Sequence, residues 1–162
     1  MAPLRKISLV FACAVLFACG GGDTTESAEQ ISEICSKAKE GTGGALRDLA
    51  PEQNPGESPL ELLGTALTRA QASIEGARDE SRSATGATDA ETEALRGMSQ
   101  VFDRMAGIAV QERQALSDAE QKGTPAALSE LQTQLGGFDS QMQSAGAELD
   151  KLARGVGLDG CS

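Results

Sequence analysis

Residues 125–156 read PAALSELQTQLGGFDSQMQSAGAELDKLARGV, and this stretch decides the fold class. Its apolar residues recur at alternating steps of three and four, which is the spacing of one face of an α-helix. They are Leu128, Leu131, Leu135, Phe138, Met142, Ala145, Leu149, Leu152 and Val156. Thr124 and Pro125 supply an N-cap and a proline at the first helical position, so a long helix is predicted to begin there.

Two earlier stretches have the same rhythm and predict two more long helices. Ser58-Pro59-x-Glu61 predicts the start of one helix, because it combines a capping box with a proline at the first helical position. This helix is expected to end near Arg82. Thr88-x-x-Glu91 predicts the start of the next, which should end at Lys122-Gly123. The first of these faces comprises Leu60, Leu63, Leu67, Ala70, Ile74 and Ala77. The second comprises Leu95, Met98, Phe102, Met105, Ala109, Glu112, Leu116 and Ala119, widened by Val101, Ile108 and Val110.

A short helix is predicted to precede these three. Ser27-x-x-Gln30 has the form of a capping box, and Ile31, Ile34 and Ala38 follow on one face. Gly41-Thr42-Gly43-Gly44 is interpreted as the linker that ends this helix, and residues 45–57 as a long loop.

No segment alternates polar and apolar residues long enough to predict a strand. The chain is therefore expected to be all-α: residues 28–162 should form an up-and-down antiparallel bundle of three long helices plus the short N-terminal helix. Strict alternation would bring Cys161 back to the end where the first helix begins. The alternative is that the apolar faces form a coiled coil between chains.

The first eighteen residues have the character of an export signal. Arg5 and Lys6 are followed by an uncharged, mostly apolar run from Ile7 to Ala18. A membrane-spanning helix needs about 20 apolar residues, so this run is too short for one and fits the apolar region of a signal peptide.

Leu16-Phe17-Ala18-Cys19 resembles the lipobox of bacterial lipoproteins, although Phe17 is larger than the residue usual there. The resemblance implies that Cys19 receives a diacylglycerol with palmitate-type acyl chains and becomes the first residue after cleavage. Residues 19–27 would then be a flexible tether to the membrane. The alternatives are a weaker match ending at Cys13, and an ordinary secretory signal with Cys19 as a free thiol.

Charge and composition exclude several classes of function. The 162-residue chain carries a net charge of −10 and has no His, Trp or Tyr. Removing residues 1–18 takes away two basic residues and no acidic ones, which leaves 144 residues and a net charge of −12. Such a charge repels nucleic acid. Without histidine the chain offers no Ser-His-Asp triad, no usual zinc site and no Glu-x-x-His iron site, so no enzyme, cofactor or metal is expected.

Two cysteines remain after Cys13 and Cys19 are assigned. Exported chains meet an oxidising compartment, so Cys35 and Cys161 are expected to form a disulfide that ties the first helix to the last residues. The alternative is a pair of buried free thiols.

The whole arrangement is similar to a broad set of small helical actinobacterial lipoproteins. These have a lipobox, an Ile-Cys in the first helix and a Gly-Leu-x-x-Cys ending, which here are Ile34-Cys35 and Gly157-Leu158-Asp159-Gly160-Cys161. The resemblance supports lipid on Cys19 and the pairing of Cys35 with Cys161. It implies no activity.

The expected function is that of a non-catalytic lipoprotein that serves as a binding or scaffold module of the cell envelope. It would lie on the extracytoplasmic face of the cell membrane or outer membrane and bind an envelope protein.

Two acidic features have alternative interpretations. Glu112 is expected to pair with Arg113 or another arginine, or to lie where the seam frays, rather than to be a buried carboxylate with a raised pKa. Asp79, Glu80, Asp89, Glu91 and Glu93 are expected to serve helix starts and arginines rather than a cation.

The alternative function is a carrier of a small apolar or lipidic ligand within the bundle. Small residues would leave space for such a ligand between the helix backbones. They are Ala66, Ala70, Ala77, Ala145 and Gly146.

Overall fold

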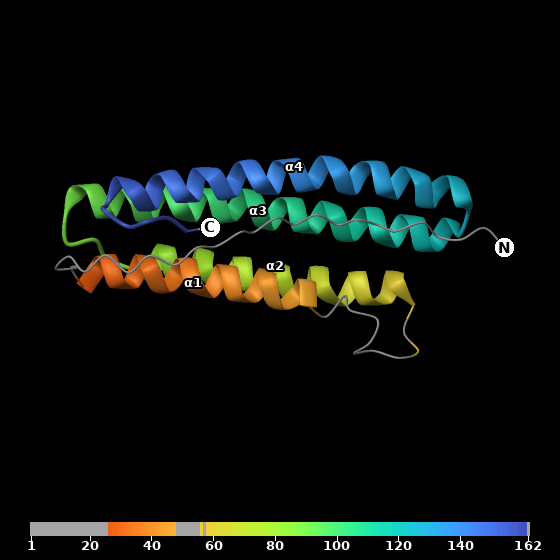
Figure 1. Cartoon of the computed structure of the whole chain (residues 1–162), viewed down its shortest axis with the longest axis horizontal. Coiled ribbons are helices and arrows are strands. Elements are labelled where there is room, and N and C mark those ends of the chain that lie inside the picture. Colours follow the sequence, from red (N-terminus) through yellow and green to blue (C-terminus); the bar gives the residue numbers. More distant parts are fainter. Residues whose placement is uncertain (1–25, 48–55, 57, 162) are drawn as a thin grey trace.

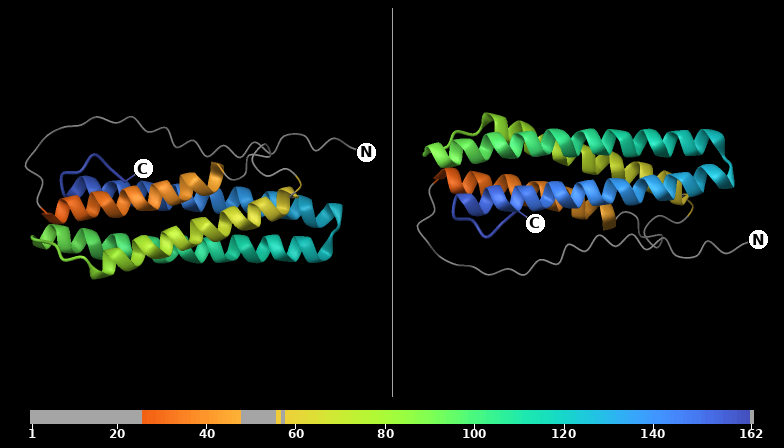
Figure 2. Two further views of the ribbon diagram at one scale, coloured as in Figure 1. Left: turned by 90° about the horizontal axis from the view of Figure 1, so that it is seen from below. Right: turned by 90° about the horizontal axis from the view of Figure 1, so that it is seen from above.

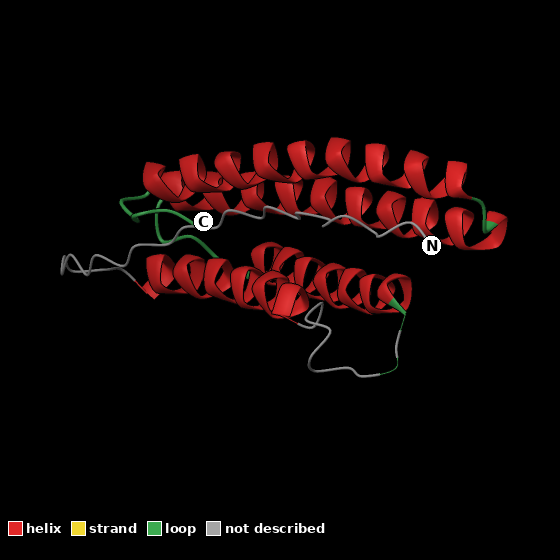
Figure 3. Ribbon diagram, turned by 45° about the vertical axis from the view of Figure 1, so that its right-hand side comes forward, coloured by secondary structure: helices red, strands yellow, loops and turns green. Residues whose placement is uncertain are grey.

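The computed structural model describes residues 26–47, 56 and 58–161, and every regular element in these ranges is a helix (Figures 1 and 3). The helices are α1 (Glu26–Arg47), α2 (Pro59–Ser83), α3 (Asp89–Lys122) and α4 (Pro125–Gly155). Successive helices run in opposite directions, and α1 is the shortest (Figure 1). The predicted all-α, up-and-down bundle is therefore confirmed.

The predicted starts of the three long helices are confirmed in atomic detail. Ser58 Oγ accepts a hydrogen bond from the Glu61 backbone N–H at 3.2 Å, and Glu61 returns one from the Ser58 N–H at 2.8 Å. Thr88 and Glu91 make the same reciprocal pair at the start of α3. Gly123 ends α3 in the left-handed conformation, at a φ of 58°, and α4 starts directly after it. Local hydrogen bonding thus fixes these boundaries.

The glycine run at residues 41–44 is not a linker, because α1 continues through it to Arg47. Gly41 is required here by close packing between α1 and α2. A Cβ built on Gly41 would lie 1.8 Å from Ser73 Oγ and 2.2 Å from Ser73 Cβ. The Ser73 hydroxyl donates a hydrogen bond to the Lys37 carbonyl at 3.1 Å. Packing against α2 therefore outweighs the poor helix propensity of glycine.

The predicted cap of the first helix is also wrong. Ser27 lies inside the first turn of α1, which begins at Glu26, and its side chain is buried. Its hydroxyl oxygen accepts a hydrogen bond from the backbone N–H of Ala87, in the connection between α2 and α3. The side chain thus links α1 to the connection between α2 and α3.

The buried apolar side chains form two separate clusters. The first cluster draws on all four helices and comprises Ile31, Ile34, Cys35, Ala38, Ile74, Ala77, Leu95, Met98, Val101, Phe102, Met105, Ala106, Ala145 and Leu149. The second cluster comprises Leu116, Ala119, Ala127 and Leu131, with Leu60, Leu63, Leu67, Ala115 and Leu135 packed against it and partly exposed. No side chain of α1 that the structure describes belongs to the second cluster, whose described members come from α2, α3 and α4 (Figure 2).

The predicted apolar faces are confirmed best on α3, the helix that packs against both long neighbours. Every residue of its predicted stripe is buried, Glu112 included. Val110, which was expected to widen that face, is 51% exposed, because it lies on the solvent side of the helix. Leu128 of α4 is 39% exposed, because α4 has α3 as its main neighbour and is open on another side. On α2, Leu62 and Ala66 are buried although neither belongs to the predicted stripe.

Polar contacts join the helices at the rim of the core. Lys37 Nζ of α1 lies 3.0 Å from Glu80 Oε1 of α2, and this contact raises the pKa of Lys37. Arg82 of α2 lies 2.6 Å from Asp103 of α3, and Arg104 of α3 pairs with Glu148 of α4. These pairs are solvent-exposed, so each contributes little to stability.

The contact at Gly41 predicts opposite effects for two neighbouring glycines. Gly41→Ala should lower the free energy of unfolding by about 1–3 kcal/mol, since the added methyl overlaps Ser73 and forces the helices apart. Gly43→Ala should raise it by about 0.5–1 kcal/mol, because a Cβ there meets nothing within 4 Å and alanine favours the helix. Urea denaturation followed by circular dichroism measures both. If α1 ended at residue 40, the two variants would behave alike.

Candidate functional site

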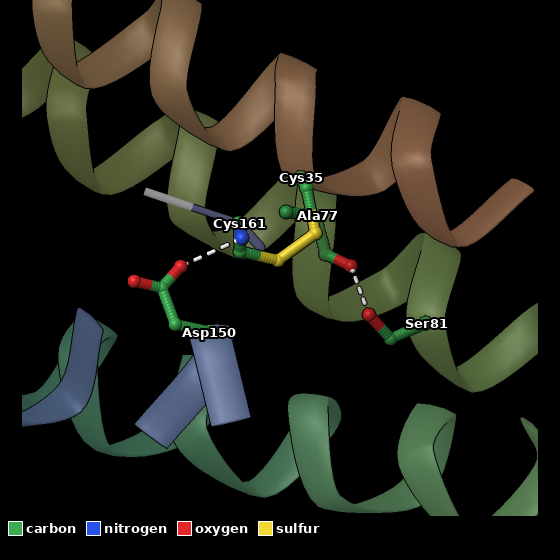
Figure 4. The surroundings of a disulfide bond; sticks show 5 residues. All are labelled: Cys35, Ala77, Ser81, Asp150 and Cys161. Carbon is green, nitrogen blue, oxygen red and sulfur yellow. Dashed lines mark hydrogen bonds between the residues drawn. A yellow bond between two sulfur atoms is a disulfide. The ribbon is translucent and has the colours of Figure 1, made fainter. Parts of the chain in front are cut away.

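A disulfide joins Cys35 of α1 to Cys161 at the end of the chain (Figure 4). The two Cα atoms lie 4.9 Å apart although the residues are separated by 126 positions in sequence. Cys35 belongs to the first cluster, and Ala77 and Ser81 of α2 lie beside the sulfur atoms (Figure 4). The predicted pairing is therefore confirmed, and the alternative of two free thiols is wrong.

The segment after α4 folds back toward α1 to reach this bond (Figure 2). Gly157 permits the turn with a φ of 85°, and the Leu158 N–H bonds to the Ala153 carbonyl at 3.1 Å. The side chains of this segment pack against the first cluster and are only partly exposed; they are Val156, Leu158 and Cys161. The end of the chain thus forms part of the core where α1 and α4 have few direct contacts.

Asp150 of α4 positions the end of the chain for the disulfide. Its Oδ1 accepts a hydrogen bond from the Cys161 backbone N–H at 2.7 Å (Figure 4). A Cβ on Gly160, whose φ is 136°, would lie 3.0 Å from that same oxygen. The role of Asp150 could not be predicted from its place in the sequence. The only signal was an acidic residue near the apolar face of the last helix, shortly before a glycine-rich ending.

Glu112 is buried, with 8% of its surface exposed, and no cation among the described residues acts on its pKa. Arg113 does not pair with it: Arg113 Nη1 donates to Gln71 Oε1 of α2 at 2.9 Å. The preferred sequence interpretation, an arginine pair or a frayed seam, is therefore wrong. Burial, followed by the negative charge of Asp139 on α4, raises the pKa of Glu112 to about 7. The Oδ1 atom of Asp139 is itself buried without a hydrogen-bond partner in the described part of the chain.

The other acidic residues singled out from the sequence are used locally. Asp79 pairs with Arg78 at 2.8 Å, Glu80 with Lys37, and Glu93 with Arg96 at 3.3 Å. Glu91 closes the capping box of α3, and Asp89 stands in its first turn. Among the described residues, no three His, Cys, Asp or Glu side chains gather in a way that could hold a metal ion.

The small residues considered as a ligand space are mostly packed. Ala66, Ala77 and Ala145 are buried, and the last two lie within the first cluster. A shallow depression of about 550 Å³ lies elsewhere, between α2 and α3. The residues that line it are Glu61, Gly64, Thr65, Thr68, Arg69, Arg113, Leu116, Ser117 and Glu120.

The proposed lipid site at Cys19, the signal segment 1–18 and the tether up to residue 25 lie outside the described residues. Within the described ranges, no helix combines the length and the apolarity needed to cross a bilayer.

Compared with protein-family models, curated proteins and solved structures, the chain matches none.

Loss of the disulfide should destabilise the bundle strongly. A Cys35→Ala/Cys161→Ala double variant is expected to lose about 4–5 kcal/mol of unfolding free energy, because the bridge closes a loop longer than 100 residues. Guanidinium denaturation measures the loss. The reduced wild-type chain is the matched control, since it keeps both cysteine side chains. It therefore separates the stability contributed by the disulfide from the stability contributed by the packing of Cys35. Equal midpoints for the oxidised and reduced chains would contradict this role.

Proposed function

We propose that the protein is a membrane-anchored, non-catalytic lipoprotein of the cell envelope that serves as a binding or scaffold module. Lipid on Cys19 would hold it on the extracytoplasmic face of the cell membrane or outer membrane. The disulfide is the observation that supports this proposal best. Disulfides persist in oxidising compartments outside the cytosol, which is where a lipobox would deliver the chain.

The geometry of the bundle suggests how the body would stand on the membrane. Only residues 20–25 separate Cys19 from the start of α1, and they span at most ~22 Å even when fully extended. The end of the bundle where α1 and α3 begin would therefore face the lipid (Figure 1). Both helices have acidic first turns, so this end would be repelled by anionic head groups.

The opposite end would then project into the envelope. The 31 residues of α4 span ~46 Å at 1.5 Å per residue, so its first turn would stand far from the anchor. This end carries the second cluster with its partly exposed leucines. A scaffold that holds a partner away from the membrane would present this end to it.

Intact mass spectrometry of the protein purified from membranes tests the anchor. The mature chain is expected to begin at Cys19, to carry a diacylglycerol, and to gain two hydrogens on reduction of the Cys35–Cys161 bond. Cys19→Ala should abolish both lipid and cleavage, because the modified thiol is lost. Cys13→Ala is the matched control and should leave both unchanged. Recovery of the uncut wild-type precursor from cytosol would overturn the proposal.

Site-specific crosslinking on intact cells tests the partner. A photo-crosslinking residue at Leu128, exposed at the projecting end, should capture the same envelope protein in every replicate. The same residue at Ala90, exposed at the end that would face the membrane, is the control and should not capture it. Repeated blanks at Leu128, or identical products at both positions, would contradict a scaffold that acts through its projecting end.

A further inference from the structure

The segment after α4 follows a path that contacts other than the disulfide support. The backbone N–H groups of Val156 and Leu158 both donate to the Ala153 carbonyl at 3.1 Å. Gly157 turns the chain with a φ of 85°. The side chains of Val156 and Leu158 are partly buried against the first cluster, so detachment of this segment would return apolar surface to water. The end of α4 therefore directs the residues that follow it back onto the bundle (Figure 2).

Two side chains of α4 hold the residues beyond this turn. Asp150 Oδ1 accepts a hydrogen bond from the Cys161 backbone N–H at 2.7 Å (Figure 4). Arg154 Nε donates to the Asp159 carbonyl at 3.4 Å, and Arg154 Nη2 lies 3.9 Å from Asp150 Oδ2. These contacts join the end of the chain to the helix that precedes it in sequence. They position Cys161 without involving α1.

Cys35 is positioned separately, by the packing of α1 on α2. It is 4% exposed, and Ile31 and Ile34 of the same helix are buried with it in the first cluster. The Ser73 hydroxyl of α2 donates to the Lys37 carbonyl of α1 at 3.1 Å. The Cα atom of Cys35 lies 4.9 Å from that of Cys161, a separation that a disulfide can span without movement of the backbone.

The two cysteines differ in their access to solvent. Cys35 is buried, and Ala77 and Ser81 of α2 lie beside it (Figure 4). Cys161 is only partly buried and belongs to the terminal segment. In thiol–disulfide exchange a thiolate must reach a sulfur atom of the oxidant, so the rate depends on access. Cys161 is therefore the cysteine of this pair that an external oxidant can reach more readily.

We propose that Cys161 is the site at which a disulfide oxidant enters, that Cys35 is the resolving thiol, and that Asp150 is the positioning residue that brings them together. The noncovalent contacts of Val156, Leu158 and Asp150 hold the terminal segment on the bundle before the bond forms. This proposal does not rest on the lipid anchor, because it concerns only residues of the described bundle.

The reaction consists of two thiol–disulfide exchanges. The Cys161 thiol loses its proton to water, and the thiolate attacks one sulfur of the oxidant, whose S–S bond breaks and whose other sulfur leaves as a thiolate. The Cys35 thiol loses its proton in the same way, and its thiolate attacks Cys161 Sγ, so that the remaining half of the oxidant leaves as a second thiolate. The two cysteine thiols are oxidised, and one oxidant disulfide is reduced to two thiols.

Asp150 should act on the second exchange and not on the first. Its hydrogen bond limits the positions that Cys161 can take, and a mixed disulfide held close to Cys35 reacts faster than one that moves freely. Hydrogen bonds to charged groups are stronger than neutral ones, so loss of this bond should slow closure about 10-fold. The first exchange needs only the exposure of Cys161 and should not become slower.

A time course on the full chain, reduced and held in mild detergent, tests the order of reaction with oxidised glutathione as the oxidant. Acid stops each sample, and peptide mass spectrometry assigns each glutathione adduct to a cysteine. The adduct at Cys161 should form about 10-fold faster than that at Cys35, because burial limits access. In concentrated urea the two rates should become similar. Cys35→Ala should accumulate the adduct at Cys161, because no resolving thiol remains.

Variants of Asp150 separate its hydrogen bond from its charge. Asp150→Ala should slow the conversion of the adduct to the closed disulfide about 10-fold. Asp150→Asn should close at nearly the wild-type rate, because its amide oxygen still accepts from the Cys161 N–H. Both variants remove the same negative charge, so the difference between them measures the hydrogen bond. Asp159→Ala is the control and should change neither exchange, since Asp159 contacts Arg154 through its backbone carbonyl.

Four results would each overturn the proposal. The first is an adduct that forms at Cys35 as fast as at Cys161 in the folded chain. The second is a preference for Cys161 that persists unchanged in concentrated urea. The third is an equal rate of closure in the Asp150→Ala and Asp150→Asn variants. The fourth is a reduced wild-type chain without helical circular dichroism under the reaction conditions, because such a chain could not hold the two thiols in place.

Discussion

The covalent bond between Cys35 and Cys161 is the constraint on which the rest of the bundle depends. Each helix packs mainly on its neighbour in sequence, so α1 relies on α2 and α4 relies on α3. Such an open chain of helices leaves the first and last elements with one main partner each. The disulfide closes it through the terminal segment, which adds Val156 and Leu158 to the first cluster, while the Asp150 carboxylate fixes the approach of Cys161. Closure therefore comes from a short tail rather than from direct packing of α1 on α4.

This closure divides the molecule into two ends with different sources of stability. The disulfide end has four helices, the larger apolar cluster and a covalent loop that constrains the unfolded chain. The other end has three helices and a smaller cluster whose leucines are partly exposed. Glu112 of α3 is buried between the two clusters. If the tether leaves from the start of α1, as we propose, the disulfide-bonded end adjoins the anchor and the end with the smaller cluster projects from it.

Features set by local chemistry could be predicted from the sequence, and features set by contacts between distant segments could not. The capping boxes at Ser58 and Thr88 were predictable, because their donors and acceptors lie three residues apart. Burial of the α3 stripe was predictable from its period. The fourth helix has an equally clean stripe, yet several of its residues are only partly buried, since periodicity shows a face and not how many neighbours cover it. The cysteine pairing followed from counting the cysteines left over, whereas its anchoring by Asp150 was not visible.

The sequence by itself determined the helical class, the starts of the three long helices and the pairing of two sulfur atoms, because each depends on short-range spacing or on residue type alone. Only the tertiary structure decided that Gly41 continues a helix instead of ending it, since that outcome depends on the close approach of Ser73. Only the tertiary structure placed Glu112 in a buried position where the charge of Asp139, 27 positions further along the chain, acts on it. The free energy of a buried charge depends on what surrounds it, and those surroundings exist only once the helices have packed.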